Sequence, residues 1–300
     1  MQRRSMLKAA AALAAFEPLM SKALGQSEST TLKEVPLGSS ATLTVERRGQ
    51  IVLFGINRPN IQNRIDPETF DSLGRVYYDY EHDPSLRAAI LFGHGRNFSR
   101  GVDVDAYAAR LRESRATSPP NPRTIDPLGK SGPHLSKPVI VVAHGDTWNM
   151  AHELMLAADI RIAAGETNFG QDENTHGRFP GGGATVRFVR EAGWGNAMRY
   201  MLTGDHWSAQ EAFRMGEIQM IASTPEQALD AAIKIATRIA ANAPLGIKTT
   251  LASAHLALDQ PEPVALSKLS EQYAALYRTQ DFIEGRRAEA EGRPPVYRGK

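Results

Sequence analysis

The 300-residue chain contains no cysteine. This absence excludes disulfide bonds, thiolate metal sites and a cysteine nucleophile, and it fits either an oxidising or a reducing compartment. The chain also lacks any run of about 18 consecutive apolar residues, so we expect no membrane span. Neither sign of charge dominates, because 35 Lys and Arg residues stand against 33 Asp and Glu residues. We therefore expect no nucleic-acid partner.

The first 25 residues have the pattern of a targeting segment. Arg3 and Arg4 precede a weakly apolar stretch over 9–16 and a small-residue site at Ala23-Leu24-Gly25. Such a segment is a signal rather than part of the fold. It resembles a twin-arginine export signal, which predicts a periplasmic protein, or a cytoplasmic one if the signal is not used. The alternatives are an amphipathic extension on a cytoplasmic protein and a start codon placed too early.

The slight basicity of the chain belongs mostly to this segment. Residues 1–25 hold four basic residues and one acidic residue, so 31 basic and 32 acidic residues remain. The rest of the chain is long enough to bury a large core as one domain with an appendage. We predict a strand-rich core over about 35–225 and a helical region over about 226–300.

Strands alternate with helices in the predicted core. Apolar or alternating stretches over 41–48 and 51–56 flank Gly49-Gln50, which predicts a β-hairpin. Asp66-Pro67 is typical of a helix start, with Asp66 as N-cap. Further strands are expected over 88–92, 138–143 and 160–163, and a helix over about 149–158. Residues 111–134 are rich in Arg, Ser, Pro and Gly and predict a mobile surface loop.

The last third of the chain is predicted to be helical. Ser208-x-x-Glu211 and Thr224-Pro225-Glu226-Gln227 both have the pattern of a capping box that opens a helix. Long periodic apolar patterns follow, through Ala228 to Ile239 and then through Val264 to Leu276.

Two glutamates are candidates for proton transfer. Glu153 lies in an apolar, helix-like run, and Glu173 follows a short strand-like run and a turn. Burial among apolar residues raises and separates carboxyl pKa values, which an acid/base pair needs. Each glutamate on its own is equally compatible with an exposed side chain or a helix cap. The eight histidines are scattered without the spacing of a metal site, so no metal is expected.

A series of short segments, taken in order and spacing, is similar to the enoyl-CoA hydratase/isomerase (crotonase) family over roughly residues 40–300. The segments are Ile56–Pro59, Gly95–Asp103, Lys137–Ile140, Glu153-Leu154, Ala158–Ala163, Phe169–Glu173, Phe179–Gly183, Leu202–Gly204, Ser208–Ala212 and Phe282–Gly285. The resemblance implies an α/β fold of the ClpP/crotonase type, a spiral of ββα units. It also implies a C-terminal helical region that mediates trimers or dimers of trimers.

The same resemblance implies a site. Backbone N–H groups of Val102 and Met150 match an oxyanion hole for the carbonyl oxygen of an acyl thioester, and backbone donors need no reorganisation as charge develops. Glu153 matches the residue that activates water for attack on C3, and Glu173 the one that relays a proton with C2. Further substrate-binding positions implied by the match are Gly101, Asp103, Ala151, Phe169, Pro180 and Gly181. Coenzyme A enters as part of the substrate, and no separate cofactor is implied.

The chain departs from the family pattern near this site. Asn149-Met150-Ala151 and then His152 stand where the family commonly has a run of glycines. Bulkier side chains there predict a narrower pocket. Asp105 stands where a lysine is frequent, and an acid would repel the phosphates of CoA. His176 is either a third titrating group or a surface residue.

Three classes of function remain open on these grounds. The first is a hydratase that adds water to a 2-enoyl thioester, which the pair of glutamates favours. The second is another enzyme of this fold, either an isomerase or a C–C hydrolase acting on a carbonyl compound that is not a CoA ester. The third is a non-catalytic exported protein, for which the two glutamates would be dispensable.

Overall fold

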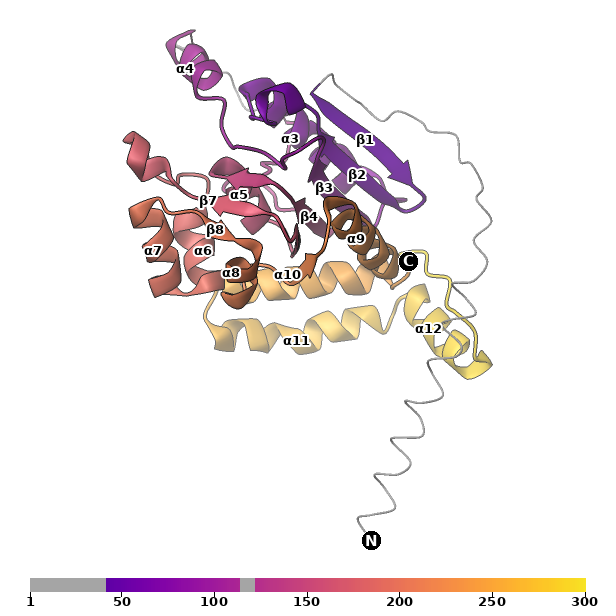
Figure 1. Cartoon of the computed structure of the whole chain (residues 1–300). Coiled ribbons are helices and arrows are strands. Elements are labelled where there is room, and N and C mark those ends of the chain that lie inside the picture. Colours follow the sequence, from indigo (N-terminus) through magenta and orange to yellow (C-terminus); the bar gives the residue numbers. More distant parts are fainter. Residues whose placement is uncertain (1–41, 114–121) are drawn as a thin grey trace, which may run out of the picture. The chain divides into compact units, whose positions relative to one another are not determined.

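The computed structural model of the protein describes residues 42–113 and 122–300. A six-stranded sheet lies at its centre, as Figure 1 shows. The strands are, in spatial order, β1 (Leu43–Arg48), β2 (Ile51–Ile56), β3 (Ala88–Gly93), β4 (Val139–Ala143), β6 (Ile160–Ala164) and β9 (Met220–Ala222). β1 and β2 form an antiparallel hairpin, and every other neighbouring pair is parallel. The hairpin predicted around Gly49 is therefore confirmed.

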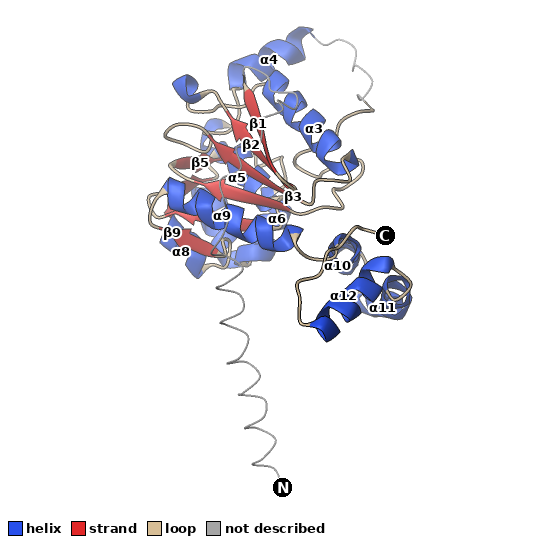
Figure 2. Cartoon of the chain, turned by 90° about the vertical axis from the view of Figure 1, so that its right-hand side faces the viewer, coloured by secondary structure: helices blue, strands red, loops and turns tan. Residues whose placement is uncertain are grey.

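Apolar side chains cover both faces of this sheet, as buried parallel strands require. Alternate strand residues, among them Ile90 and Ile140, contact the alanine stripe of α9 (Pro225–Ala240). The residues of opposite parity, such as Leu91 and Val141, join a core that includes α3 (Pro67–His82) and α5 (Met150–Leu156). Figure 2 shows helices against the strands of the sheet.

A second, smaller sheet supports the loops between these elements. It consists of β5 (Asp146–Trp148), β7 (Asn168–Gly170) and β8 (Trp207–Ser208), with β5 and β7 parallel and β7 and β8 antiparallel. Short elements complete this part of the chain: η1 (Pro59–Ile61), α4 (Val104–Glu113), η2 (Glu173–His176), α6 (Ala184–Ala192), α7 (Trp194–Thr203) and α8 (Ala209–Arg214).

The predicted helix starts are confirmed by their hydrogen bonds. The Thr69 N–H donates to Oδ1 of Asp66 at 2.8 Å, and Pro67 is the first residue of α3. Ser208 and Thr224 accept in the same way from the N–H groups three residues later, at 3.2 and 3.3 Å. Each cap satisfies a donor that the first turn of a helix cannot pair internally.

The mobile surface loop predicted over 111–134 is wrong in two places of its described part, whereas residues 122–134 contain no helix or strand, as predicted. Residues 111–113 belong to α4, and the side chains of Ile125 and Leu128 are only 3% and 2% exposed. The N–H of Ile125 donates to the carbonyl oxygen of Gly74 at 3.0 Å. Two apolar residues within a polar stretch thus anchor the segment against α3, which composition alone does not reveal.

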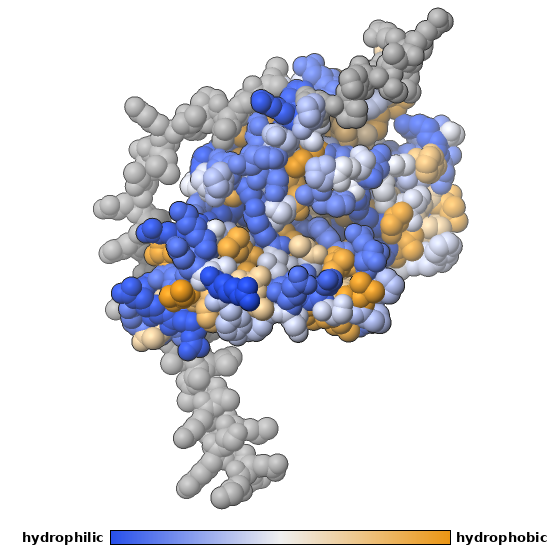
Figure 3. Space-filling view, turned by 180° about the vertical axis from the view of Figure 1, so that it is seen from behind, coloured by the Kyte–Doolittle hydropathy of each residue, from blue (hydrophilic) through white to orange (hydrophobic). Residues whose placement is uncertain are grey.

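Three helices end the chain: α10 (Pro244–Asp259), α11 (Glu262–Leu276) and α12 (Gln280–Glu291). Apolar residues lie among hydrophilic ones in the lower part of Figure 3, where these helices run. The exposed apolar side chains on them are Leu258, Val264, Leu266, Leu269, Tyr273 and Ile283. Within residues 42–113 and 122–300, no helix is both long and apolar enough to cross a bilayer.

The division into a core over 35–225 and a helical region over 226–300 stays a prediction. Helix α9, which begins the predicted helical region, packs on the sheet. The predicted signal over 1–25 lies outside the described residues.

Candidate active site

Glu153 lies in α5 with its side chain directed at a neighbouring loop. Glu153 is only 3% exposed, and its Oε1 accepts from the N–H groups of Gly182 at 2.7 Å and Ala184 at 3.2 Å. A Cβ on Gly182 would lie 2.2 Å from Oε2 of Glu153, so a glycine is required for this approach. The structure thus adds Gly182 to the predicted site, where the sequence analysis had named only Pro180 and Gly181.

Glu173 is the first residue of η2 and is 7% exposed. Both of its carboxyl oxygens accept from Nε2 of Gln171, at 2.9 and 3.1 Å. Burial raises the pKa of Glu173 to about 7, and the charge of Glu153 acts in the same direction. The fold therefore brings the two predicted glutamates into electrostatic contact.

The N–H groups of Val102 and Met150 lie on adjoining segments. Hydrogen bonds from Ile65 to Gly101 (2.8 Å) and from Asp103 to Ile65 (2.9 Å) fix the backbone on both sides of Val102. Met150 opens α5, and its nitrogen would lie 3.3 Å from a Cβ on Gly101. In the part of the chain that the structure describes, neither N–H donates to a protein acceptor. Two free backbone donors, one of them at the N-terminus of a helix, are suited to bind an oxyanion.

The conformation of Asn149 explains how the chain can do without a glycine at this position. Its φ of 53° and ψ of −119° belong to a region that glycine adopts far more readily than other residues. Its Nδ2 donates to Oδ1 of Asp172 at 2.8 Å, and the Asp172 N–H donates to its Oδ1 at 2.9 Å. These paired bonds hold Asn149 in a glycine-like conformation, so the N–H of Met150 keeps its place.

This strained residue gives an unusual order of stabilities. Asn149→Ala keeps the strain, which is worth about 1–3 kcal/mol, and loses both side-chain hydrogen bonds to Asp172. Asn149→Gly loses the same bonds but relieves the strain. We therefore expect the alanine variant to be the less stable of the two in urea unfolding. Equal midpoints, or a more stable alanine variant, would show that the backbone is not strained there.

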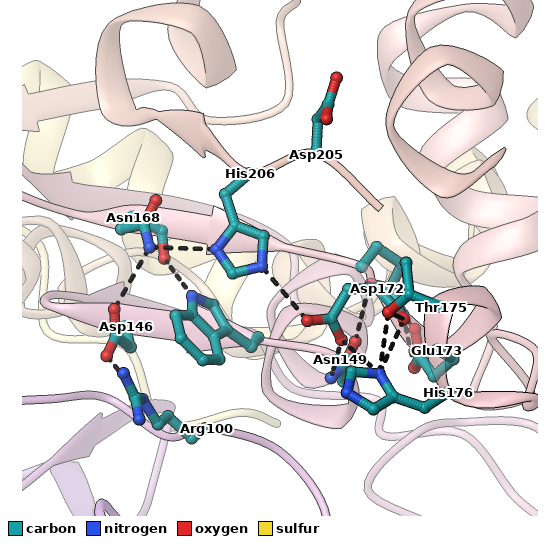
Figure 4. A network of polar contacts seen from close by, with 12 residues as sticks. Arg100, Asp146, Asn149, Asn168, Asp172, Glu173, Thr175, His176, Asp205 and His206 are labelled. Atoms are coloured by element: carbon teal, nitrogen blue, oxygen red, sulfur yellow. Dashed lines mark hydrogen bonds and ion pairs between the residues drawn. The ribbon is translucent and has the colours of Figure 1, made fainter. Parts of the chain in front are cut away.

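A cavity of about 240 Å³ is lined by Val102 and by Asn149, the residue before Met150. Its lining is Arg64, Arg100, Val102, Asp103, Val104, Asp105, Trp148, Asn149, Asp172, His176 and Arg178. Arg100 forms an ion pair with Asp146 at 2.7 Å and lies 4.1 Å from the ring centre of Trp148. Figure 4 shows this pair and, beside it, His206, whose Nε2 lies 3.3 Å from Oδ2 of Asp172.

The three arginines of this cavity were missed by the sequence analysis. Arg64, Arg100 and Arg178 come from separate segments, so no local motif marks them. The negative charge of Asp105 is therefore accompanied by three positively charged side chains in the lining of this cavity. The side chains of Arg64 and Arg178 have no hydrogen-bond or ion-pair partner among the described residues, which leaves them available for an anionic ligand.

A larger cavity of about 720 Å³ lies between α10 and the body of the protein. Leu154 and Leu156 of α5 line it, together with Leu251 and Leu258 of α10. Val102 lines the smaller cavity and not this one, whereas Met150 lines neither.

The remaining predicted residues lie around this site with other contacts. Asp103 accepts from the N–H of Ala106 at 3.3 Å and lies 3.7 Å from Arg58. Ala151 and Phe169 are fully buried, and Phe169 stacks on Trp207 with ring centres 6.0 Å apart. Gly181 is exposed, whereas Pro180 is buried. Substrate binding by these residues stays a prediction.

His176 is a surface residue in this structure. Its side chain is 57% exposed, and Nδ1 lies 2.9 Å from the hydroxyl of Thr175. Across residues 42–113 and 122–300, no group of three or more His, Asp and Glu side chains is arranged to hold a metal ion.

Comparisons with known proteins agree on one relationship. The model of the enoyl-CoA hydratase/isomerase family matches residues 46–300. An enoyl-CoA hydratase of Mycobacterium tuberculosis is 33% identical over 258 residues, covering 85% of this chain and 96% of that protein. An (E)-benzylidenesuccinyl-CoA hydratase of Thauera aromatica is 30% identical over 86% of this chain and 99% of its own length. A probable enoyl-CoA hydratase/isomerase from Mycobacterium abscessus, of known structure, is 38% identical with a TM-score of 0.83, covering 87% of this chain and all of that one.

Proposed function

The chain belongs to the enoyl-CoA hydratase/isomerase family and has the α/β crotonase fold with a C-terminal helical region, and from this premise we propose that it adds water across the C2=C3 bond of a 2-enoyl-CoA. Relatives at about 30% identity support an activity of the enoyl-CoA hydratase kind. The observation that carries the proposal is the pair of buried glutamates beside two free backbone N–H groups. The family typically needs no cofactor.

In the proposed reaction the two glutamates have different tasks. Glu153, held by the N–H groups of Gly182 and Ala184, takes a proton from water as the water oxygen bonds to C3. The N–H groups of Val102 and Met150 hold the enolate oxygen. Glu173, with its raised pKa, then gives a proton to C2. Different surroundings for two carboxyl groups are the usual basis for such a division between base and acid.

The pH dependence of the reaction follows from this assignment. The active pair carries one proton, and the pKa of Glu173 is raised to about 7, so kcat/KM is expected to fall as the pH rises above about 7. Hydration and dehydration must show the same limb in kcat/KM, because the overall equilibrium involves no proton. Both directions can be followed through the enoyl-thioester absorbance. A profile that is flat through neutral pH would contradict the role given to Glu173.

The cavity arginines support a CoA ester over a neutral carbonyl compound. Arg64 and Arg178 line the cavity that includes Val102, where their positive charges would attract the anionic groups of a bound CoA ester and offset the repulsion of those groups by Asp105. The experiment that tests the proposed function is turnover of a short trans-2-enoyl-CoA by protein that begins at about residue 26. Absence of both turnover and CoA binding, with the protein folded, would favour the non-CoA alternative.

We also propose that the protein assembles as a trimer or a dimer of trimers. The exposed apolar residues of α10 and α11, such as Leu266 and Tyr273, support a surface that is covered by another copy. Light scattering on the purified protein tests this, and a monomer at micromolar concentration would reject it.

The export of the protein remains our proposal from residues 1–25. A twin-arginine route carries folded proteins, so an assembled enzyme of this kind is compatible with it. Replacement of Arg3 and Arg4 by lysine should then retain the protein in the cytoplasm, as cell fractionation would show. Equal distribution of the wild type and this variant would favour a cytoplasmic enzyme.

A further inference from the structure

A buried series of polar side chains leads from Trp207 of the small sheet to Glu173. Nε1–H of Trp207 donates to Oε2 of Glu217 at 2.9 Å, and Nε2 of His152 lies 2.9 Å from Oε1 of the same carboxylate. Nδ1 of His152 contacts Oε1 of Gln171, whose Nε2 donates to Glu173. His152, Gln171 and Glu217 are all 0% exposed, so bulk solvent does not reach these side chains.

The donor and acceptor atoms of each group determine the direction of every hydrogen bond in this series of side chains. Gln171 presents its N–H₂ group to Glu173 and therefore its carbonyl oxygen to His152. Nδ1 of His152 must donate to that oxygen. Nε2 faces a carboxylate oxygen of Glu217 and must donate as well. A ring that donates from both nitrogens is an imidazolium.

The surroundings of His152 agree with a cation. Burial alone acts to lower the pKa of His152, but the charge and hydrogen bond of Glu217, together with Gln171 and Glu153, raise it overall. The other neighbours of the ring are apolar faces and edges of Phe169, Phe188 and Trp207, with ring centres 5.0 to 6.3 Å away. Glu217 is thus the direct counter-ion of His152, and the charges of Glu153 and Glu173 also interact with it.

We propose that His152, kept protonated by the buried carboxylate of Glu217, is a positioning residue that holds the amide of Gln171 with its N–H₂ group toward Glu173. This inference rests on the proposed function only in that Glu173 is taken as the proton donor to C2. The amide orientation makes Glu173 a hydrogen-bond acceptor and so opposes its protonation. The burial of Glu173 favours its protonation, and the pair His152–Glu217 limits that effect.

A neutral His152 would have the opposite influence. With a proton on Nε2 only, Nδ1 becomes an acceptor, and the amide of Gln171 turns to donate to it. The carbonyl oxygen of Gln171 then faces Glu173 and is satisfied only by a protonated carboxyl group. The protonation of Glu173 is in this way coupled to that of His152 through one amide group, without any change in the backbone.

Replacement of His152 tests this coupling. The double variant His152→Phe/Glu217→Gln keeps an aromatic ring in the cluster, removes the Nδ1 donor and leaves no unpaired buried carboxylate. We expect the Glu173 titration, and with it the basic limb of kcat/KM, to move up by about one pH unit, the scale of one hydrogen bond to a charged group.

Glu217→Gln alone is the matched control. Its amide oxygen can accept from Trp207 while its N–H₂ group donates to Nε2 of a neutral ring, which then still donates from Nδ1 to Gln171. The limb of this control should therefore stay near its wild-type position. A double variant that loses stability or kcat without a shift of the limb relative to this control would overturn the proposal.

Two NMR measurements test the inference independently of turnover. In the wild type at pH 7, nitrogen-15 spectra should show both ring nitrogens of His152 protonated; a singly protonated ring would overturn the proposal even if the double variant does not fold. Carbon-13 titration of the Glu173 carboxyl, assigned by its loss in Glu173→Gln, should show the same upward shift in His152→Phe/Glu217→Gln and not in Glu217→Gln alone. A shift without turnover of the enoyl-CoA would reject the proposed function and leave the positioning role standing, whereas turnover without a shift would do the reverse.

Discussion

Glu153→Gln and Glu173→Gln are each expected to lower kcat for hydration of a short trans-2-enoyl-CoA by about 10²- to 10⁴-fold, the usual contribution of one positioned acid or base. An amide is close in size to a carboxyl group but cannot take a proton from water or give one to C2. In Glu153→Gln the amide oxygen can still accept from the N–H groups of Gly182 and Ala184, so the fold should be kept. The measurement is the rate at which the enoyl-thioester absorbance disappears.

The two variants also separate the classes of function that the sequence leaves open. Glu166→Gln, an exposed glutamate in the turn after β6, is the control and should turn over like the wild type. A large loss in Glu173→Gln alone, with Glu153→Gln close to wild type, would indicate an enzyme that moves a proton without adding water. Wild-type levels in both variants would reject the proposed chemistry altogether.

Removal of one oxyanion donor is expected to lower kcat by about 10²- to 10³-fold, as the loss of one preorganised hydrogen bond typically does. Met150→Pro removes the N–H at the first position of α5, where proline is tolerated because that N–H has no partner within the helix. Proline restricts the residue before it, so the substitution is best made together with Asn149→Gly. The kinetic constants of this double variant are the measurement.

Asn149→Gly alone is the reference for this experiment. It keeps the N–H of Met150 and should retain most of the activity, since glycine adopts the positive φ of residue 149 without strain. The fall in kcat should then appear only on adding the proline, with a folded protein by circular dichroism. A double variant as active as its reference would mean that Met150 donates no hydrogen bond in the transition state.

The sequence alone predicted the features that depend on near neighbours in the chain. The hairpin at Gly49, the strands with apolar patterning and the caps at Asp66, Ser208 and Thr224 follow from interactions within a few residues. The two glutamates were selected as candidates from their local motifs, and their catalytic role stays a prediction. The buried anchor at Ile125 was missed, because its partner Gly74 lies in a distant helix.

Tertiary structure alone decided how these residues are joined into a site. Glu153 meets Gly182 across 29 residues, and His152 meets Glu217 across 65, at positions set by the packing of α5 against the loop before α6 and the small sheet. The cavity arginines likewise come from separate segments. Periodicity and capping express forces that act within one helix or strand. The protonation and orientation of buried groups depend instead on charges and hydrogen bonds that only the folded chain brings within contact, and therefore no local pattern records them.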